Sequence, residues 1–246
     1  MKKQFLAVTV VLLVLLSMTA MADTNRYDPQ IQQAVNQKIQ KAKQLQNVSS
    51  SVEDGIVTLT GTVGLYEEKL AAADKIKKIA NVAGVRNDIA VSGPTVADSE
   101  LQKKLGKQVA YDRVGYPDNT FNYLAVGVKD GVVTLSGDVV WSVPLDDAMA
   151  LASRTPGVKD VVNDVNVLPV SGFDDSIRVR MARAIYRDSV LGRYASDPVH
   201  PIRIVVDNGH VTLYGSVEST MDRNVAGIRA GEVSGAFSVD NKLVVD

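Results

Sequence analysis

The sequence has 246 residues, with 27 basic and 28 acidic side chains, two histidines and no cysteine. Its formal net charge of −1 provides no overall field that would hold a nucleic acid, so we expect no nucleic-acid partner. Because cysteine is missing and histidine is scarce, we expect no disulfide framework, no lipidated cysteine, no metal site and no cofactor.

The first 22 residues have the pattern of an export signal. Lys2 and Lys3 precede an almost unbroken apolar run over 5–16, and Ala20-Met21-Ala22 has the small-x-small pattern of a signal-peptidase site. We predict a signal peptide over 1–22 that is cleaved after Ala22. An uncleaved membrane anchor is the alternative, but the run is shorter than the roughly 20 apolar residues that span a bilayer. We therefore expect export to a bacterial periplasm.

One short pattern occurs three times in the chain, as DGIVTLTG, DGVVTLSG and NGHVTLYG. The copies begin at residues 54, 130 and 208, and so lie 76 and 78 residues apart. This spacing exceeds the period of about 20–50 residues found in solenoid proteins, so each copy is predicted to belong to a small domain. The predicted domains cover 28–93, 98–168 and 174–246.

Each predicted domain, which we call a module, starts with the signal of a helix N-terminus. Asp28 precedes a proline, Asp98 begins a pattern that resembles a capping box with Gln102, and Asp174 begins an acidic pair. Apolar residues then recur at four-residue spacing, which predicts one narrow apolar stripe on each helix. The stripes are Ile31, Val35 and Ile39; Leu101, Leu105 and Val109; and Ile177, Met181 and Ile185.

The repeated pattern itself predicts a β-hairpin. Its Asp-Gly or Asn-Gly pair tolerates the positive φ angles of a two-residue turn, and apolar and polar residues alternate in the strand that follows. That strand is therefore expected to have one buried and one exposed face. Gly61, Gly137 and Gly215 fall on the buried face, where we expect the missing side chain to let a helix approach closely.

A second amphipathic helix is predicted over 66–80, 143–153 and 219–230, and a valine-rich strand follows it. The order α-β-β-α-β contains a β-α-β crossover, which makes the last strand parallel to the second and antiparallel to the first. The predicted fold class is α+β, with three tandem αββαβ modules, each a small mixed three-stranded sheet covered by two helices. The order of the strands in each sheet stays open.

The second and third modules carry inserted loops, 110–120 and 188–200, that the first module lacks. Loops on a rigid scaffold often carry binding residues, and a lid over the sheet edge is the alternative. The loop-binding candidates in or beside these segments are Tyr111, Tyr116, Tyr186 and Tyr194.

The first helix of the third module carries the most suggestive charge pattern. Arg180, Arg183 and Arg187 are spaced to share one helix face, and Arg178 lies nearby. Such a face could meet anionic lipid headgroups. The alternative is a solvated helix face whose charge is partly offset by the carboxylates of Asp174, Asp175 and Asp188.

Trp141, the single tryptophan, lies between a predicted strand and a predicted helix. An interfacial headgroup anchor would have this character, so Trp141 joins the lipid-binding candidates. A hydrophobic staple at the helix entry is the alternative interpretation.

The repeated hairpin, the helix after it and the Gly-Val pair before the last strand resemble the BON domain, in three copies over nearly all of 28–246. That resemblance implies residence in the bacterial envelope, binding of phospholipid membranes or envelope proteins, a role in envelope or osmotic stress, and no enzymatic chemistry. The third module departs from the pattern, with Asn208 in the turn and Gly235-Ala236 in place of Gly-Val.

The sequence therefore favours two functions. The leading one is a non-enzymatic periplasmic protein that binds anionic phospholipid surfaces. The alternative is a periplasmic chaperone or scaffold for exported and outer-membrane proteins, which would use the tyrosine-bearing loops and apolar surfaces. No nucleophile motif, phosphate loop or dinucleotide fingerprint occurs in the sequence, so we expect no catalytic residue and no small-molecule substrate.

Overall fold

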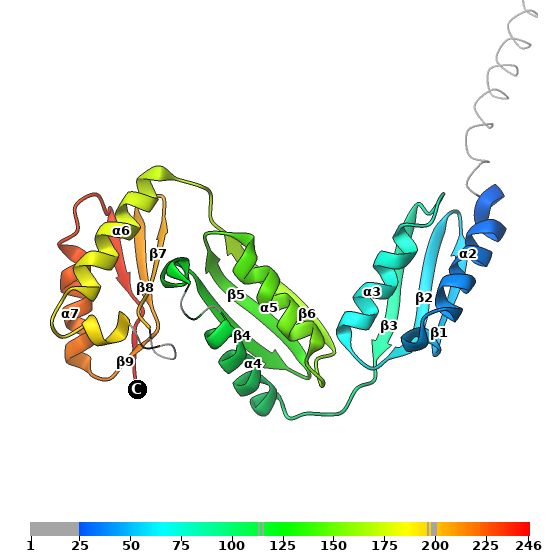
Figure 1. Cartoon of the computed structure of the whole chain (residues 1–246), viewed down its shortest axis with the longest axis horizontal. Coiled ribbons are helices and arrows are strands. Elements are labelled where there is room, and N and C mark those ends of the chain that lie inside the picture. The colour runs from blue at the N-terminus through cyan, green and yellow to red at the C-terminus, as the bar shows by residue number, and fades with distance from the viewer. Residues whose placement is uncertain (1–24, 113, 115, 196, 198–200) are drawn as a thin grey trace, which may run out of the picture. The chain divides into compact units, whose positions relative to one another are not determined.

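The computed structural model describes residues 25–112, 114, 116–195, 197 and 201–246. The predicted signal peptide, 1–22, lies outside the described residues. The chain divides into two compact units, one ending at Ser92 and the other covering Gly93–Asp246. Figure 1 shows that the first unit holds one layer of helices against one small sheet, and that the second unit repeats this arrangement twice.

The first unit is a single αββαβ module. Its strands lie in the order β1-β2-β3, with β1 antiparallel and β3 parallel to the central strand. The two α-helices and one face of the sheet share a single hydrophobic core, so both helices cover the same face. The elements are η1 (Asn25–Tyr27), α2 (Asp28–Gln40), η2 (Lys43–Leu45), β1 (Val48–Glu53), β2 (Ile56–Val63), α3 (Tyr66–Lys77) and β3 (Gly84–Val91).

The second unit contains two further modules with the same topology. Their central strands are β5 and β8, each paired with an antiparallel strand before it and a parallel strand after it. In the last module, β9 and β11 form a separate parallel pair. The elements are α4 (Asp98–Asp112), η3 (Pro117–Phe121), β4 (Tyr123–Lys129), β5 (Val132–Val139), α5 (Ser142–Arg154), β6 (Asp160–Val167), α6 (Gly172–Tyr186), η4 (Gly192–Ala195), β7 (Arg203–Asp207), β8 (His210–Tyr214), β9 (Ser216–Val217), α7 (Thr220–Gly231), β10 (Ser238–Asn241) and β11 (Val244–Val245).

The α+β class and the repeated mixed sheets confirm the predicted fold. The predicted primed turns are confirmed as well, because both central residues have positive φ in all three hairpins. In the first hairpin, for example, φ is 51° at Asp54 and 75° at Gly55. The structure adds the strand order, which places the second strand of each module at the centre of its sheet.

The acidic residue at the start of each first helix has a role that differs from helix capping. The carboxylate of Asp28 accepts hydrogen bonds from the backbone N–H groups of Asp54 and Gly55, at 2.9 and 2.8 Å. Asp98 and Asp174 bind the other two turns in the same way. The expected N-cap at Asp28 is wrong, since Tyr27 occupies the N-cap position and makes no side-chain cap. These carboxylates fasten the helix start to the hairpin turn.

The recurrence of Gly61, Gly137 and Gly215 in the three modules has a different cause from the one predicted. A Cβ atom on any of them would lie closer than 3.0 Å to a backbone carbonyl oxygen of the chain entering the first strand. For Gly137 that oxygen belongs to Tyr123. The three residues also have φ between 111° and 122°, which favours glycine. The close neighbour is therefore the chain beside the strand, and the prediction of a helix there is wrong.

The two modules of the second unit pack against each other. The guanidinium of Arg203, at the start of β7, donates a hydrogen bond from Nη1 to the carbonyl oxygen of Asn119 in η3, at 2.6 Å. The rings of Tyr123 and Tyr214 stack with 3.9 Å between their centroids and an interplanar angle of 2°. Contacts between η3, β4 and β7 join these modules into one unit.

Candidate functional site

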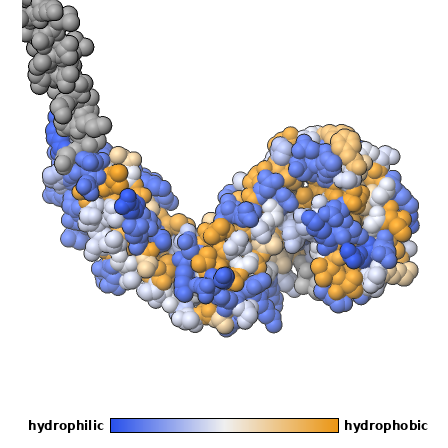
Figure 2. Space-filling view, turned by 180° about the vertical axis from the view of Figure 1, so that it is seen from behind, coloured by the Kyte–Doolittle hydropathy of each residue, from blue (hydrophilic) through white to orange (hydrophobic). Residues whose placement is uncertain are grey.

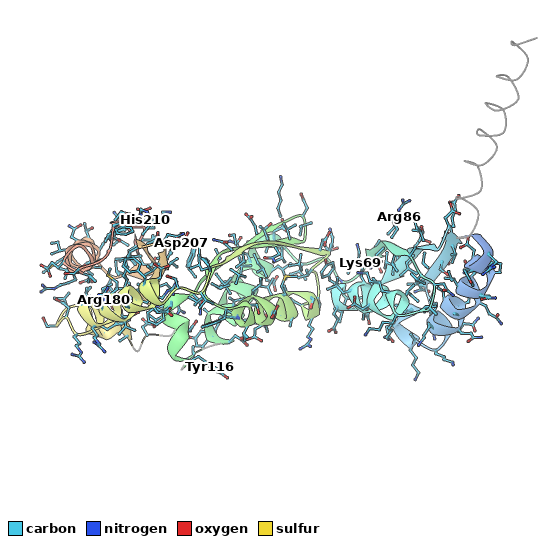
Figure 3. All side chains as sticks on the ribbon, turned by 90° about the horizontal axis from the view of Figure 1, so that it is seen from above. Lys69, Arg86, Tyr116, Arg180, Asp207 and His210 are labelled. Atoms are coloured by element: carbon cyan, nitrogen blue, oxygen red, sulfur yellow. The ribbon has the colours of Figure 1, made fainter. Side chains whose placement is uncertain are left out.

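Helix α6 presents the arginine residues singled out in the sequence. The side chain of Ser171 caps its N-terminus by accepting a hydrogen bond from the N–H of Asp174, at 3.2 Å. The predicted apolar stripe of Ile177, Met181 and Ile185 is fully buried in the core. This anchors one side of the helix and leaves the opposite side to solvent. Arg180, Arg183 and Arg187, which we call the arginine face, are exposed on that side, and Figure 3 shows Arg180 on α6.

Arg178 does not belong to the arginine face. Its side chain is only 2% exposed, with Nη1 donating to Asp175 Oδ1 and Nη2 donating to the Val206 carbonyl oxygen, both at 2.6 Å. Arg178 therefore ties α6 to β7, and its prediction as a lipid contact is wrong because a headgroup cannot reach the guanidinium. The spacing explains this, since Arg178 precedes Met181 by three residues and Ile185 by seven, which places it beside the buried stripe.

The acidic residues expected to offset the arginine face are engaged elsewhere. Asp174 holds the turn amides of Asn208 and Gly209, and Asp175 pairs with Arg178. Asp188 pairs with Arg229 at 2.7 Å, and that hydrogen bond, together with the N–H of Val190, lowers the pKa of the Asp188 carboxyl. None of these three carboxylates is paired directly with the arginine face.

Among the described residues, no carboxylate lies within ion-pair distance of Arg180, Arg183 or Arg187. These three guanidinium groups are therefore open to solvent and not held in ion pairs.

Two exposed phenylalanines border the arginine face, and sequence reasoning missed both. Phe173 and Phe237 are 48% and 69% exposed, and their ring centroids are 5.7 Å apart. Phe173 precedes Arg180 by seven residues, so both lie on the same side of α6. The Arg180 guanidinium in turn lies against Gly235, where a Cβ would be 2.9 Å from Nη2. The seven-residue spacing could have identified Phe173 from sequence, whereas only the fold brings Phe237 beside it.

Trp141 lies beside the N-terminal half of α6, next to Asp175 and Val179. It occupies the N-cap position of α5 in an extended conformation, and its side chain is 49% exposed. Trp141, Phe121 and Val179 line an apolar cavity of about 150 Å³ between the two modules of the second unit. The fold thus brings Trp141 to α6, although the two are far apart in sequence. The N′ position, where a staple residue would sit, belongs to the buried Val140.

The four loop tyrosines do not form one surface. Tyr111 and Tyr116 are exposed, and Figure 3 shows Tyr116 at the outer edge of its module. Tyr194 is buried in the core of the last module. Tyr186 packs against that core and donates its hydroxyl hydrogen to the Ile202 carbonyl oxygen, and burial raises its pKa to about 12. The prediction that Tyr186 and Tyr194 offer free binding surfaces is therefore wrong.

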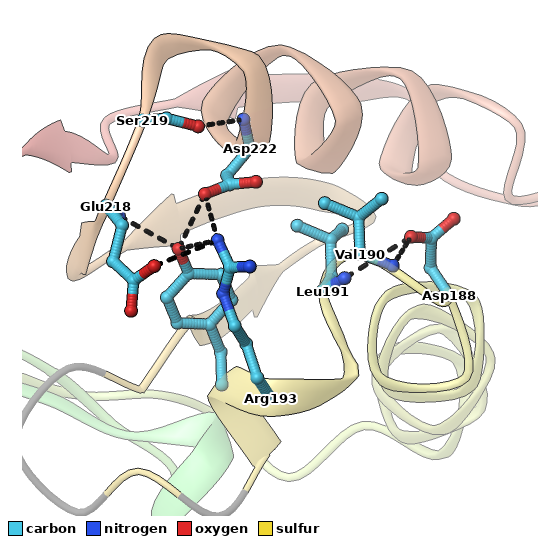
Figure 4. A network of polar contacts seen from close by, with 8 residues as sticks. Asp188, Val190, Leu191, Arg193, Glu218, Ser219 and Asp222 are labelled. Carbon is cyan, nitrogen blue, oxygen red and sulfur yellow. Dashed lines mark hydrogen bonds and ion pairs between the residues drawn. The ribbon is translucent and has the colours of Figure 1, made fainter.

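Tyr194 belongs to a polar network that fastens the second inserted loop to α7. Figure 4 shows its centre, where Arg193 Nη2 and the Tyr194 hydroxyl both donate to Asp222 Oδ2, at 2.5 and 2.8 Å. The Tyr194 hydroxyl also accepts from the N–H of Glu218 at 2.8 Å. Burial would raise the pKa of Asp222, but hydrogen bonds from Tyr194, Ser219 and Arg193 outweigh it and lower that pKa. Every group in the network is paired, so we assign it a structural role.

In the part of the chain that the structure describes, no group of three histidine, cysteine, aspartate or glutamate side chains could hold a metal ion. Every helix described there is too short or too polar to cross a bilayer.

A family model described as the BON domain matches residues 27–93, 97–169 and 184–246. The chain belongs to the BON domain family. The three matches correspond to the three repeated modules of the fold. The third match begins at residue 184, inside α6, so Phe173, Arg180 and Arg183 precede it. Most of the arginine face is therefore a feature of this chain that the family match does not include.

Two solved structures are remotely similar to the chain. The structure of CdsD, a structural protein of the Type III secretion system of Chlamydia trachomatis, has a TM-score of 0.24 and 13% identity, over 86% of this chain and 90% of that chain. The periplasmic domain of the inner membrane protein PrgH from S. typhimurium has a TM-score of 0.19 and 10% identity, over 85% and 100%. No curated protein matches the chain. Likeness at this level carries no argument about function.

Proposed function

We propose that this BON family member is a non-enzymatic protein of the periplasm that binds anionic phospholipid membrane surfaces. The observation that carries the proposal is the arginine face. Arg180, Arg183 and Arg187 lie together on α6 without carboxylate partners among the described residues, and the exposed rings of Phe173 and Phe237 border them. A cationic helix face edged with aromatic side chains suits the interface of an anionic bilayer.

The expected affinity is modest. A basic side chain close to an anionic membrane contributes about 1 kcal/mol, so the arginine face supplies about 3 kcal/mol. Partial burial of Phe173 and Phe237 adds a share of the roughly 1.5–3 kcal/mol that full burial of an apolar side chain provides. Figure 2 shows further hydrophobic patches among hydrophilic residues on one face of the C-terminal module. Binding of this strength is reversible and falls as salt screens the charges.

Vesicle flotation tests the proposal. The mature chain should float with vesicles that contain phosphatidylglycerol and stay unbound with phosphatidylcholine vesicles, and added salt should weaken the interaction. Replacement of Arg180, Arg183 and Arg187 by serine should abolish flotation.

A matched control replaces Lys75, Lys77 and Lys78 by serine, which removes the same charge from exposed positions at the end of α3. The control should float normally. Flotation that survives loss of the arginine face, or that both variants lose equally, would refute the proposed site.

A chaperone role is the second candidate, supported by the exposed side chains of Tyr111, Val114 and Tyr116 in the first inserted loop. Such a surface could hold apolar segments of exported or outer-membrane proteins. This candidate predicts that the chain suppresses aggregation of an unfolded outer-membrane protein. Suppression should survive the arginine replacements and be lost when Tyr111 and Tyr116 are both replaced by serine.

A further inference from the structure

A second feature of the Gly93–Asp246 unit is a cavity of about 160 Å³ between its two modules. Val109 of α4 and Ala148 and Leu151 of α5 form an apolar part of its lining. Asn119 of η3 and Arg203 of β7 contribute polar groups. None of these residues belongs to the arginine face or its aromatic border, so the cavity is separate from the proposed membrane site.

Arg203 lines this cavity and carries a charge that has no ion-pair partner among the described residues. Its guanidinium is partly buried, and Nη1 donates to the Asn119 carbonyl oxygen at 2.6 Å. Among the described residues, no carboxylate lies within ion-pair distance of it. The nearby Tyr186 hydroxyl is neutral at physiological pH, because burial raises its pKa to about 12. A partly buried cation without a counter-ion is costly, and an anionic ligand would relieve that cost.

Gly106 leaves room in the same cavity. It lies in the interior of α4, where glycine costs about 1 kcal/mol relative to alanine. A Cβ atom built on Gly106 would meet no neighbouring atom within 4 Å. Its φ is not positive either, so neither close packing nor backbone conformation requires glycine here. Gly106 is one of the residues that line the cavity, and the space where its side chain would lie is open.

We propose that this cavity binds a small organic carboxylate, with the carboxylate on Arg203 and an apolar group against α4 and α5. A guanidinium matches a carboxylate with two parallel hydrogen bonds. A cavity of about 150 Å³ holds a benzene ring, which sets the size of the apolar group. The sequence alone led us to expect no small-molecule substrate. The cavity indicates a ligand, and no reaction on it is implied.

Asp112 provides an internal check on the sign of the ligand charge. It is the one acidic side chain among the described lining residues, and it lies exposed at the end of α4. Its negative charge opposes an anionic ligand, so Asp112→Asn should tighten carboxylate binding. A cationic ligand would show the opposite response.

Benzoate and benzyl alcohol are the probes, because they have nearly the same shape and differ in charge. In nuclear magnetic resonance titrations of the full chain, benzoate should shift the signals of the cavity-lining residues. Benzyl alcohol should bind about tenfold more weakly, since a hydrogen bond to a charged group is worth roughly one power of ten or more in affinity.

Two variants and one control complete the test. Arg203→Gln should weaken benzoate binding about tenfold and make the two probes equal. Gly106→Leu should block both probes by filling the cavity, whether or not Arg203 is altered. Lys107→Gln removes an exposed charge from α4 outside the cavity lining and should change neither affinity.

The proposal is overturned if wild-type protein binds both probes equally, if Arg203→Gln behaves like Lys107→Gln, or if neither probe shifts the lining signals. Vesicle flotation of the Arg203→Gln variant should be unchanged, so the outcome here is distinguishable from that of the membrane proposal.

Discussion

The carboxylate of Asp98 accepts a hydrogen bond from the backbone N–H of Gly131 at 2.9 Å. This contact fastens the first turn of α4 to the hairpin between β4 and β5, elements that are more than thirty residues apart. Asp28 and Asp174 make the equivalent contacts in the other modules. The acidic residue and the turn glycine therefore form one recurring contact that holds the start of the helix against the hairpin turn.

Replacement of Asp98 by alanine should lower the free energy of unfolding by about 2 kcal/mol, because two hydrogen bonds to a charged acceptor are lost. Glu100→Ala is the matched control, since it removes the same charge from the same helix turn and should change stability by less than about 0.5 kcal/mol. Urea unfolding of the full chain gives both values. Equal effects would mean that helix electrostatics, and not the turn contact, explains why an acidic residue recurs at this position in the three modules.

Gly137→Ala should destabilise the second unit by about 3 kcal/mol or more, because the new methyl group collides with the Tyr123 carbonyl oxygen and the φ of 122° strains any other residue. Gly127→Ala on the neighbouring strand provides the comparison. A methyl group there meets its nearest atom at 3.9 Å, so stability should be kept or slightly increased. Thermal unfolding of both variants tests the difference, and a tolerated Gly137→Ala would contradict the assigned cause.

Most of the fold was predictable from the sequence because the same pattern of residues occurs in all three modules. The Asp-Gly or Asn-Gly turn and the alternating strand after it recur with the same neighbours, so the local signals support one another. The strand order could not be predicted, because hydrophobic alternation does not say which strand has a partner on each side. The reason for Gly137 was also missed, since the carbonyl oxygen of Tyr123 reaches it only through the sheet register.

The candidate site was predictable in part. The spacing of Arg180, Arg183 and Arg187 is enough to place them on one exposed helix face. The same periodicity, applied more strictly, would have placed Arg178 on the buried side. The partners of Asp188 and the position of Phe237 depend on contacts between distant segments, and no local pattern reveals them. The sequence therefore predicts which charges share a surface better than it predicts which of them are neutralised.

Acid should remove the stabilisation that Asp188 provides. Its pKa is lowered from the ordinary 3.8, chiefly by the hydrogen bond from Arg229 and then by the N–H of Val190, and these contacts are lost on unfolding. A carboxyl group whose pKa is lower in the folded than in the unfolded protein stabilises the fold fully above its unfolded-state pKa. That contribution is lost as the pH falls through the folded-state pKa. The advantage of wild type over Asp188→Asn should therefore be present at pH 6 and shrink below about pH 4.

Urea midpoints measured between pH 3 and pH 6 give this comparison. Asp146→Asn is the control, because Asp146 is an exposed carboxyl on α5 that makes no hydrogen bond or ion pair in the described structure. The urea midpoint of Asp146→Asn, plotted against pH, should run parallel to that of wild type. A constant gap between wild type and Asp188→Asn over the whole range would show that the Arg229 contact contributes nothing through ionisation.

The stacked rings of Tyr123 and Tyr214 should couple the second and third modules energetically. Their centroids lie 3.9 Å apart with nearly parallel planes, an arrangement worth about 1 kcal/mol beyond the buried area. The repeats place Thr60 and Ser136 where the third module has Tyr214, so this ring is specific to the interface. A double-mutant cycle with Tyr123→Ala and Tyr214→Ala should give a coupling energy of about 1 kcal/mol in urea unfolding.

The same cycle with Tyr111→Ala and Tyr214→Ala should be additive, because Tyr111 is exposed on α4 and makes no ring contact with Tyr214. Loss of the stack should weaken the coupling of the two modules without separating them, since the Arg203–Asn119 hydrogen bond and the other contacts between η3, β4 and β7 remain. Additivity in the Tyr123 cycle would show that the stacked rings do not couple the modules.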